Sequence, residues 1–151
     1  MISYRNAISE DIEGIAVLHT KSWQENYRGA LSDDFLDNKA LSDRMKVWLE
    51  RLQNADSAKK IIVAELEGII EGFVCVFFEH SKSYGTLLDN LHVSSKLKGQ
   101  GIGTKLMLLA AEAINSRNAG SDMYLWVLNQ NLGAIRFYEM LGGEKRNRGG
   151  D

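Results

Sequence analysis

Cysteine is almost absent from this chain of 151 residues, and basic residues show no excess over acidic ones. The single cysteine, Cys75, excludes an intrachain disulfide and a zinc site built on several cysteines. It lies in the apolar run 73–78, where a cysteine is typically a small buried hydrophobe. The chain has 18 basic and 20 acidic residues and a formal net charge of −2, which argues against a nucleic-acid-binding protein.

Long apolar runs are also lacking, since no stretch reaches the roughly 20 residues that a membrane-spanning helix needs. The first five residues do not have the pattern of a signal peptide. We therefore expect a cytoplasmic protein with no membrane partner. With 44% hydrophobic and 25% charged residues, the composition is typical of a single globular domain, which we place at 1–151.

The hydrophobic periodicity changes along the chain and predicts an alternation of helices and strands. The expected elements are a strand at 2–5, a helix at 10–25 with Ser9 as its N-cap, a loop at 26–38 with room for one helical turn, a helix around 45–52, strands at 60–66, 69–79 and 86–93, a helix at 101–116, a strand at 123–128, and a last helix from Asn131 to Leu141. Gly72 interrupts its strand and predicts a bulge or a close backbone approach. This order predicts an α/β fold with one mixed central sheet and helices on both faces.

Three alternating glycines, Gly99, Gly101 and Gly103, open the helix that follows the strand 86–93. Unpaired N–H groups and the helix dipole make such a helix entrance a binding site for phosphate or pyrophosphate. Two other phosphate-binding motifs are excluded if they start at Gly99. At position 104 a P-loop requires glycine and a dinucleotide-binding fingerprint requires glycine or alanine, but the residue there is Thr104. A glycine-rich turn without a ligand remains the alternative.

Three stretches of the sequence point to one family. The segment 91–106 reads LHVSSKLKGQGIGTKL, which fits the pattern Gln/Arg-x-x-Gly-x-Gly/Ala except that Lys98 stands at its first position. The segment 125–131 reads LWVLNQN and is followed by Ala134, Phe137-Tyr138 and Leu141-Gly142-Gly143. Near the N-terminus, Trp23-x-x-x-Tyr27-x-Gly29 precedes Phe35-Leu36. Together these stretches resemble the GNAT superfamily of acyl-CoA-dependent N-acetyltransferases.

The resemblance implies a GNAT-like fold whose sheet is splayed between the fourth and fifth strands, with acetyl-CoA as co-substrate and no metal. The pantetheine arm would occupy the splay and pair with the fourth strand. The contacts implied for coenzyme A are the backbone of Leu91, His92 and Val93; the pyrophosphate loop of Lys98, Gly99, Gln100, Gly101, Ile102, Gly103 and Thr104; and Asn131, Ala134 and Tyr138 along the other side of the arm.

In this family the acceptor amine attacks the thioester directly, without an acyl-enzyme. The resemblance assigns Tyr138 the role of hydrogen-bond or proton donor to the departing thiolate. Strand alternation places Asp89 on the face of Leu91 and Val93, which makes Asp89 the candidate for ordering a water or the acceptor ammonium. His92 points the other way and is a second candidate base; a site with no dedicated base is the third alternative.

The acceptor side is less defined by the sequence. Trp23, Tyr27 and Phe35 either wall the acceptor site, as the resemblance implies, or pack in the core. The acceptor is a small-molecule or protein amine. A non-catalytic acyl-CoA-binding module remains an alternative, favoured by Leu87 at a position where many relatives carry glutamate, and nucleotide-triphosphate binding at the glycine loop is a third class.

The C-terminal segment departs from the family pattern. Relatives usually continue with two more strands, but the last eight residues, 144–151, are too polar and too short to form them. An uncovered edge strand at Met123–Leu128 invites pairing with another chain. We therefore expect either a homodimer through that edge or a truncated product with a weakened acceptor site.

Overall fold

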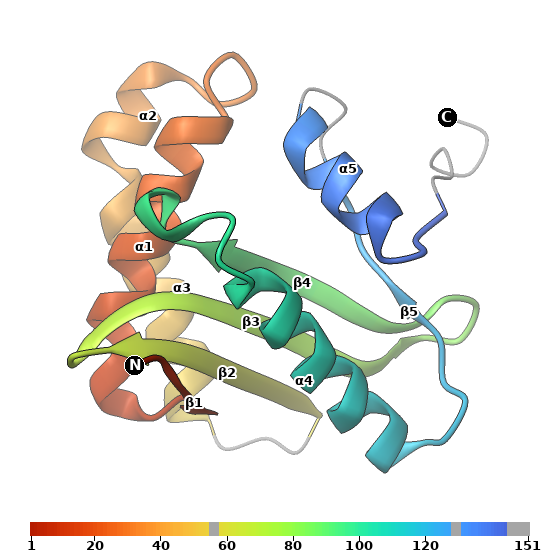
Figure 1. Cartoon of the computed structure of the whole chain (residues 1–151). Helices are drawn as coiled ribbons and strands as arrows, with labels where there is room; N and C mark the ends of the chain where they lie inside the picture. The colour runs from red at the N-terminus through yellow and green to blue at the C-terminus, as the bar shows by residue number, and fades with distance from the viewer. Residues whose placement is uncertain (55–57, 128–130, 145–151) are drawn as a thin grey trace.

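The computed structural model describes residues 1–54, 58–127 and 131–144 (Figure 1). Its elements in chain order are β1 (Ser3–Asn6), a 3-10 turn (Ser9–Asp11), α1 (Ile12–Asn26), α2 (Asp33–Asn38), α3 (Ala40–Gln53), β2 (Lys59–Leu66), β3 (Ile69–Ser81), β4 (Gly85–Val93), a second 3-10 turn (Ser95–Leu97), α4 (Ile102–Arg117), β5 (Met123–Tyr124) and α5 (Leu132–Met140). The predicted order of strands and helices is confirmed, and the predicted loop 26–38 contains α2.

The five strands form one mixed sheet in the order β1-β2-β3-β4-β5. The pairs β1–β2, β2–β3 and β3–β4 are antiparallel, and the pair β4–β5 is parallel. Figure 1 shows α4 crossing one face of this sheet, with α1 and α3 on the opposite face. The prediction of a mixed sheet with helices on both faces is therefore confirmed.

Two hydrophobic cores lie on the two faces of the sheet, because successive strand residues point to opposite sides. One core joins α4 to β2, β3 and β4, through Ile62, Ala64, Val74, Val76, Leu88, Ile102, Leu106, Ala110 and Ile114. The other joins α1 and α3 to β2 and β3, through Ile15, Ala16, Leu18, Trp48, Ile61, Val63, Phe73 and Cys75. Cys75 is fully buried, as its apolar surroundings in the sequence predict.

Gly72 brings α4 close to the sheet. The β2–β3 register shifts between Ala64 and Glu65, which marks an irregularity next to Gly72. A Cβ atom at Gly72 would lie 3.2 Å from Ile102 Cγ2 and 3.2 Å from Leu106 Cδ1, closer than most real contacts. The predicted bulge and the predicted close approach are both present. They allow the first turns of α4 to pack closely against β3.

Two local predictions are wrong. Ser9 is not the N-cap of the first helix but begins a 3-10 turn, because the Asp11 carboxylate accepts the Ile8 N–H at 2.8 Å and also binds Arg5 at 2.7 Å. The predicted strand 123–128 is shortened to β5, since its pairing with β4 ends at Leu87 and Tyr124 and residues 125–127 are not in a strand. Residues 128–130 and 145–151, which include part of that strand and most of the polar C-terminal segment, lie outside the described residues.

The described helices include none that is both long enough and apolar enough to cross a bilayer.

Candidate active site

The glycine loop forms an open helix entrance. Gly99 has φ +85° and Gly101, the N-cap of α4, has φ +85° and ψ +4°, a left-handed conformation that favours glycine. No heavy atom lies within 4 Å of a Cβ built at either position, so these glycines are needed for the backbone conformation and not for space. Because the N-cap supplies no side chain to the first turn of α4, the N–H groups there remain available to an anion.

Gly103 has a different role. Its φ is not positive, and a Cβ there would lie 3.4 Å from Phe137 Cζ and 3.7 Å from Val93 Cγ2. These are ordinary contact distances, and they place the ring of Phe137 in α5 close to the first turn of α4 and to the end of β4. This contact places α5, which carries Tyr138, beside the helix entrance.

Three contacts hold the segment between β4 and α4. The Ser94 N–H donates to the Glu71 carbonyl oxygen at 2.8 Å, and the Lys96 ammonium lies 3.4 Å from the buried Glu71 carboxylate. The Ser95 hydroxyl donates to the Glu25 carboxylate at 3.1 Å, which connects the segment to α1. The loop is thus fixed to β3 on one side and to α1 on the other.

The sheet opens where a pantetheine arm is expected. The β4–β5 ladder consists of Thr86 opposite Met123 and Leu87 opposite Tyr124, whereas β4 continues to Val93. Within the described residues, the β5 side of β4 therefore has no strand partner from Leu88 to Val93. The predicted splay is confirmed, and its open edge presents the backbone N–H and C=O groups of alternate residues in the segment 91–93 to an added extended chain.

The predicted orientation of Asp89 is wrong. Opposite β3, Cys75 pairs with Asn90 but Val76 pairs with Leu88, so Asp89 is the extra residue of a β-bulge. The bulge puts the side chains of Asp89 and Asn90 together on the α1/α3 face, where both bind Arg51. Asp89 therefore shares a face with His92, which lies opposite Phe73, and not with Leu91.

A pair of histidines lies behind this bulge on the α1/α3 face. The fully buried His19 accepts the Trp48 indole N–H on Nδ1 at 3.0 Å, so the proton of the neutral ring is on Nε2, which has no hydrogen-bond partner within the described chain. His92 stacks at 4.6 Å between ring centroids, and its Nδ1 lies 2.7 Å from the Ser22 hydroxyl oxygen. Burial, followed by nearby positive charges, lowers the pKa of His92 to about 4. Burial also lowers the pKa of His19.

These two histidines make the fold sensitive to acid. The unfolded chain takes up protons at about pH 6.5, whereas the folded chain keeps both rings neutral, so the free energy of unfolding should fall as the pH drops from 6.5 towards 4. Between pH 7 and pH 5 we expect a loss of up to about 2 kcal/mol for each histidine. His19→Gln keeps a hydrogen-bond acceptor for Trp48. In denaturant titrations, its free energy of unfolding should fall less between pH 7 and pH 5 than that of wild type. The exposed His80→Gln should match wild type. If the free energy of unfolding of His19→Gln depends on pH as steeply as that of wild type, the account is contradicted.

Electrostatic influence links two phenols and one carboxylate that come from separate parts of the chain. Burial first and the neighbouring Tyr27 phenol second raise the pKa of Tyr138 to about 12. Burial, with the charge of Asp89 as the second cause, also raises the pKa of Tyr27. The charge of Asp89 in β4 therefore acts on Tyr27, the residue that follows α1, and the Tyr27 phenol acts on Tyr138 in α5; both phenols keep their protons at neutral pH.

The predicted acceptor-side aromatic residues form one cluster. Trp23 stacks on Tyr27 at 5.8 Å and contacts Phe35 at 6.2 Å between ring centroids. The Arg44 guanidinium covers the Trp23 ring at 4.2 Å. All three predicted residues are half-buried, so they are available both for packing and for contact with a ligand.

Asn131 and Ala134 lie at the start of α5. The Asn131 side-chain oxygen accepts the Ala134 N–H at 3.2 Å, which confirms the predicted cap. Gly142, at φ +95°, follows the helix, and the Gly143 N–H donates to the Tyr138 carbonyl, which confirms the predicted stop. Because the cap uses the acceptor oxygen of Asn131, its amide N–H groups are the part left for a ligand.

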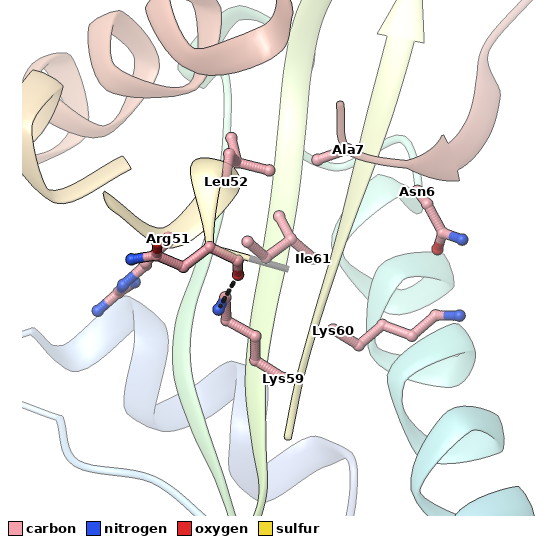
Figure 2. A pocket seen from close by; sticks show the side chains of 8 residues that line it. Asn6, Ala7, Arg51, Leu52, Lys59, Lys60 and Ile61 are labelled. Carbon is pink, nitrogen blue, oxygen red and sulfur yellow. Dashed lines mark hydrogen bonds between the residues drawn. The ribbon is translucent and has the colours of Figure 1, made fainter. Parts of the chain in front are cut away.

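A cavity of about 290 Å³ lies between the end of α3 and the β1–β2 edge. Its lining includes Arg51, Lys59 and Lys60 (Figure 2). Lys59 and Lys60 extend to opposite sides of β2, and the Lys59 ammonium donates to the Asn54 carbonyl oxygen at 3.0 Å. The two ammonium groups do not converge, so this cavity is not built for an anion.

Comparison with known proteins assigns the family. The model of the acetyltransferase (GNAT) family matches residues 14–142. The chain belongs to the GNAT family. This GNAT chain is 28% identical over 148 residues to the uncharacterized N-acetyltransferase YuaI of Bacillus subtilis, which covers 96% of the chain and 82% of the relative. It is 30% identical over 140 residues to an uncharacterized N-acetyltransferase of Archaeoglobus fulgidus, covering 89% of the chain and 87% of the relative.

A solved structure shares the GNAT fold. The PaiA N-acetyltransferase of Thermoplasma acidophilum, crystallised in complex with coenzyme A, superposes with a TM-score of 0.80 at 19% identity, covering 93% of this chain and 88% of that one. The resemblance drawn from the glycine loop and the α5 motif is therefore confirmed at the level of family and fold. Within the described residues no group of three or more His, Cys, Asp and Glu side chains is placed to hold a metal ion.

Sequence reasoning missed Arg51, Ser22 and His19. Arg51 binds the bulge, Ser22 holds the His92 ring, and His19 stacks on it. The bulge follows from packing that the sequence does not record: Leu88 and Leu91 are three positions apart, and both pack against the α4 core. A regular strand would put them on opposite faces, so the polar pair between them requires an extra residue.

Proposed function

We propose that this GNAT protein transfers an acetyl group from acetyl-CoA to a primary amine by direct attack within a ternary complex. The observation that carries the proposal is the uncapped entrance of α4, with Gly99 and Gly101 in left-handed conformations, beside the unpaired edge of β4. A pyrophosphate fits the helix entrance, and an extended pantetheine arm fits the open strand edge. One chain of atoms in coenzyme A joins these two groups.

The coenzyme contacts follow from this arrangement. The backbone of Lys98 to Thr104 supports the pyrophosphate, and Leu91, His92 and Val93 pair with the arm. Asn131 and Ala134, at the start of α5, are proposed to line the other side of the arm, with Tyr138 one turn further along the helix. Support comes from the coenzyme A complex of the structurally similar PaiA N-acetyltransferase.

The reaction forms one C–N bond and breaks one C–S bond. The acceptor must lose its ammonium proton before attack, which costs about 4–5 kcal/mol at pH 7 for an alkylamine of pKa ~10.4. The Asp89 carboxylate is the first candidate for taking this proton, directly from an ordered ammonium or through an ordered water at the opening of the sheet. The neutral His92 ring, on the same face, is the second candidate, and the third is a site in which solvent takes the proton.

Tyr138 acts on the leaving group. Its pKa of about 12 stays above that of a free thiol, roughly 8.5, so complete proton transfer to the thiolate is uphill. The phenol therefore stabilises the developing thiolate by a hydrogen bond, and the proton released by the amine completes the thiol. Trp23, Tyr27 and Phe35 form the wall against which a small-molecule or protein amine lies.

Thiol release from acetyl-CoA tests the proposal. We expect turnover with at least one member of a panel of small amines, polyamines, aminoglycosides and peptides with free N-termini or lysines. Stabilisation by coenzyme A without thiol release from any of them would leave the acyl-CoA-binding module, which the ion-paired state of Asp89 favours. Stabilisation by ATP and magnesium, but not by coenzyme A, would point to nucleotide binding and contradict the proposal.

The sequence-based expectations of a cytoplasmic protein, of one domain over 1–151 and of a homodimer stay predictions. The dimer would use the outer edge of β5. Within the described chain, only two residues of β5 pair with β4. Sedimentation at micromolar concentration decides it, because a single monomeric species contradicts the dimer.

A further inference from the structure

Arg51, near the C-terminal end of α3, reaches across to two consecutive residues of β4. Its Nη1 donates to the Asn90 side-chain oxygen at 2.6 Å, and its Nη2 donates to Asp89 Oδ2 at 2.7 Å. The planar guanidinium presents its N–H groups in a fixed fork, so the two bonds fix two separate side chains relative to each other. Arg51 therefore clamps both polar residues of the bulge.

The guanidinium is itself held in place. It lies over the rings of Trp48 and Phe77, at 4.8 Å and 5.1 Å from their centroids, and its Nη1 lies 3.8 Å from Cys75 Sγ. Its side chain is 20% exposed, and that of Asp89 is 32% exposed. Stacking on two aromatic rings leaves the arginine little freedom to move away from the bulge.

The clamped residues lie where the sheet begins to open. Pairing of β4 with β5 ends at Leu87, and the bulge follows directly at Asp89 and Asn90. The residues expected to pair with the pantetheine arm, Leu91 to Val93, come next. A change in the bulge would shift the register of these residues and redirect their backbone groups.

Asp89 keeps one oxygen for other partners. Its Oδ2 is bound by Arg51, while Oδ1 has no hydrogen-bond partner among the described residues. The clamp thus fixes the direction in which the second oxygen points. The negative charge of Asp89 is also the second cause, after burial, of the raised pKa of Tyr27, one of the residues proposed for the acceptor wall.

We infer that Arg51 is a positioning residue for acetyl transfer. It holds the Asp89–Asn90 bulge so that the open edge of β4 and the remaining oxygen of Asp89 keep their productive placement, and it does not touch either substrate. This inference rests on the proposed function, because it assigns Arg51 a role in that reaction. Misplacement of reacting groups by about 1 Å can cost about a hundredfold in rate.

The first test compares Arg51→Met, Arg51→Lys and the control Arg117→Met. Arg117 also stacks on an aromatic ring, Phe78 at 4.7 Å, but at the far end of α4. Arg51→Met should lower kcat roughly 10- to 100-fold and raise the KM for acetyl-CoA, because the edge of β4 that pairs with the arm would no longer be held in register. Arg51→Lys should recover the melting temperature but not kcat, because one ammonium cannot reproduce the fork. Arg117→Met should keep kcat. Wild-type kcat in Arg51→Met, or full recovery of kcat in Arg51→Lys, overturns the inference.

A double-mutant cycle shows whether Arg51 acts through Asp89. Asp89→Asn removes the charge and keeps the shape, so the double variant Arg51→Met/Asp89→Asn should be little slower than the slower single variant. Independent, multiplicative losses in kcat contradict an action through Asp89.

Hydrogen exchange separates this inference from the proposed function. In Arg51→Met, backbone amides 88–93 should exchange at least about tenfold faster than in wild type, whereas Arg117→Met leaves them unchanged. If no amine is acetylated by wild type, the proposed function fails, and the exchange result still decides whether Arg51 holds the bulge. Unchanged exchange of these amides in Arg51→Met overturns the inference whatever the activity.

Discussion

Gly101→Ala should weaken the binding of coenzyme A by about tenfold or more, the largest effect on binding that we expect from one added methyl group. Gly101 has φ +85° at the N-cap of α4, and a residue with a Cβ in the left-handed region costs about 1–2 kcal/mol. No atom lies within 4 Å of the added Cβ, so the helix entrance can relax by changing its backbone. That change redirects the N–H groups expected to hold the pyrophosphate, which calorimetry with coenzyme A would measure.

The matched control is Gly120→Ala, at the other end of the same helix. Gly120 has φ +79° and also has no heavy atom within 4 Å of a built Cβ. Both variants should lose similar stability in thermal unfolding, but only Gly101→Ala should lose affinity for coenzyme A. Equal affinities in the two variants would show that the helix entrance does not bind the pyrophosphate.

Tyr138→Phe should lower kcat by about 10²-fold or more while leaving the dissociation constant of coenzyme A within about threefold. The substitution keeps the ring and removes the O–H that is proposed to stabilise the leaving thiolate. At neutral pH this phenol is fully protonated, because burial and the Tyr27 phenol raise its pKa to about 12. The loss should therefore be nearly constant from pH 6 to pH 9, measured as thiol release with a saturating amine.

Tyr4→Phe is the control for this substitution. Tyr4 lies in β1 and packs against the α4 core, away from the splay, and burial raises the pKa of its phenol as well. A loss of kcat in Tyr138→Phe that Tyr4→Phe does not share supports a role at the reacting sulfur. Full kcat in Tyr138→Phe contradicts the assigned role, whatever the result for Tyr4→Phe.

The parts of the site that depend on local rules were predictable from the sequence. Gly99 and Gly101 adopt the left-handed conformations that few other residues accept, and Asn131 caps α5. Each of these features is decided by residues next to one another in the chain.

The parts that depend on contacts between distant segments were not predictable. The orientation of Asp89 was wrong because burial of Leu88 and Leu91 on one face introduces a bulge that simple alternation does not contain. The clamp of this bulge comes from Arg51, 38 positions earlier in the chain. The length of β5 depends on where it diverges from β4, which no local pattern records.

A titration of the ¹⁵N-labelled protein with coenzyme A tests the central claim most directly. We predict that saturable binding shifts the backbone amide resonances of Gly99, Gly101 and Gly103, together with those of Leu91 to Val93, and that ATP with magnesium does not reproduce these shifts. Binding of coenzyme A that leaves the three glycine resonances in place, or no binding at all, would contradict the account.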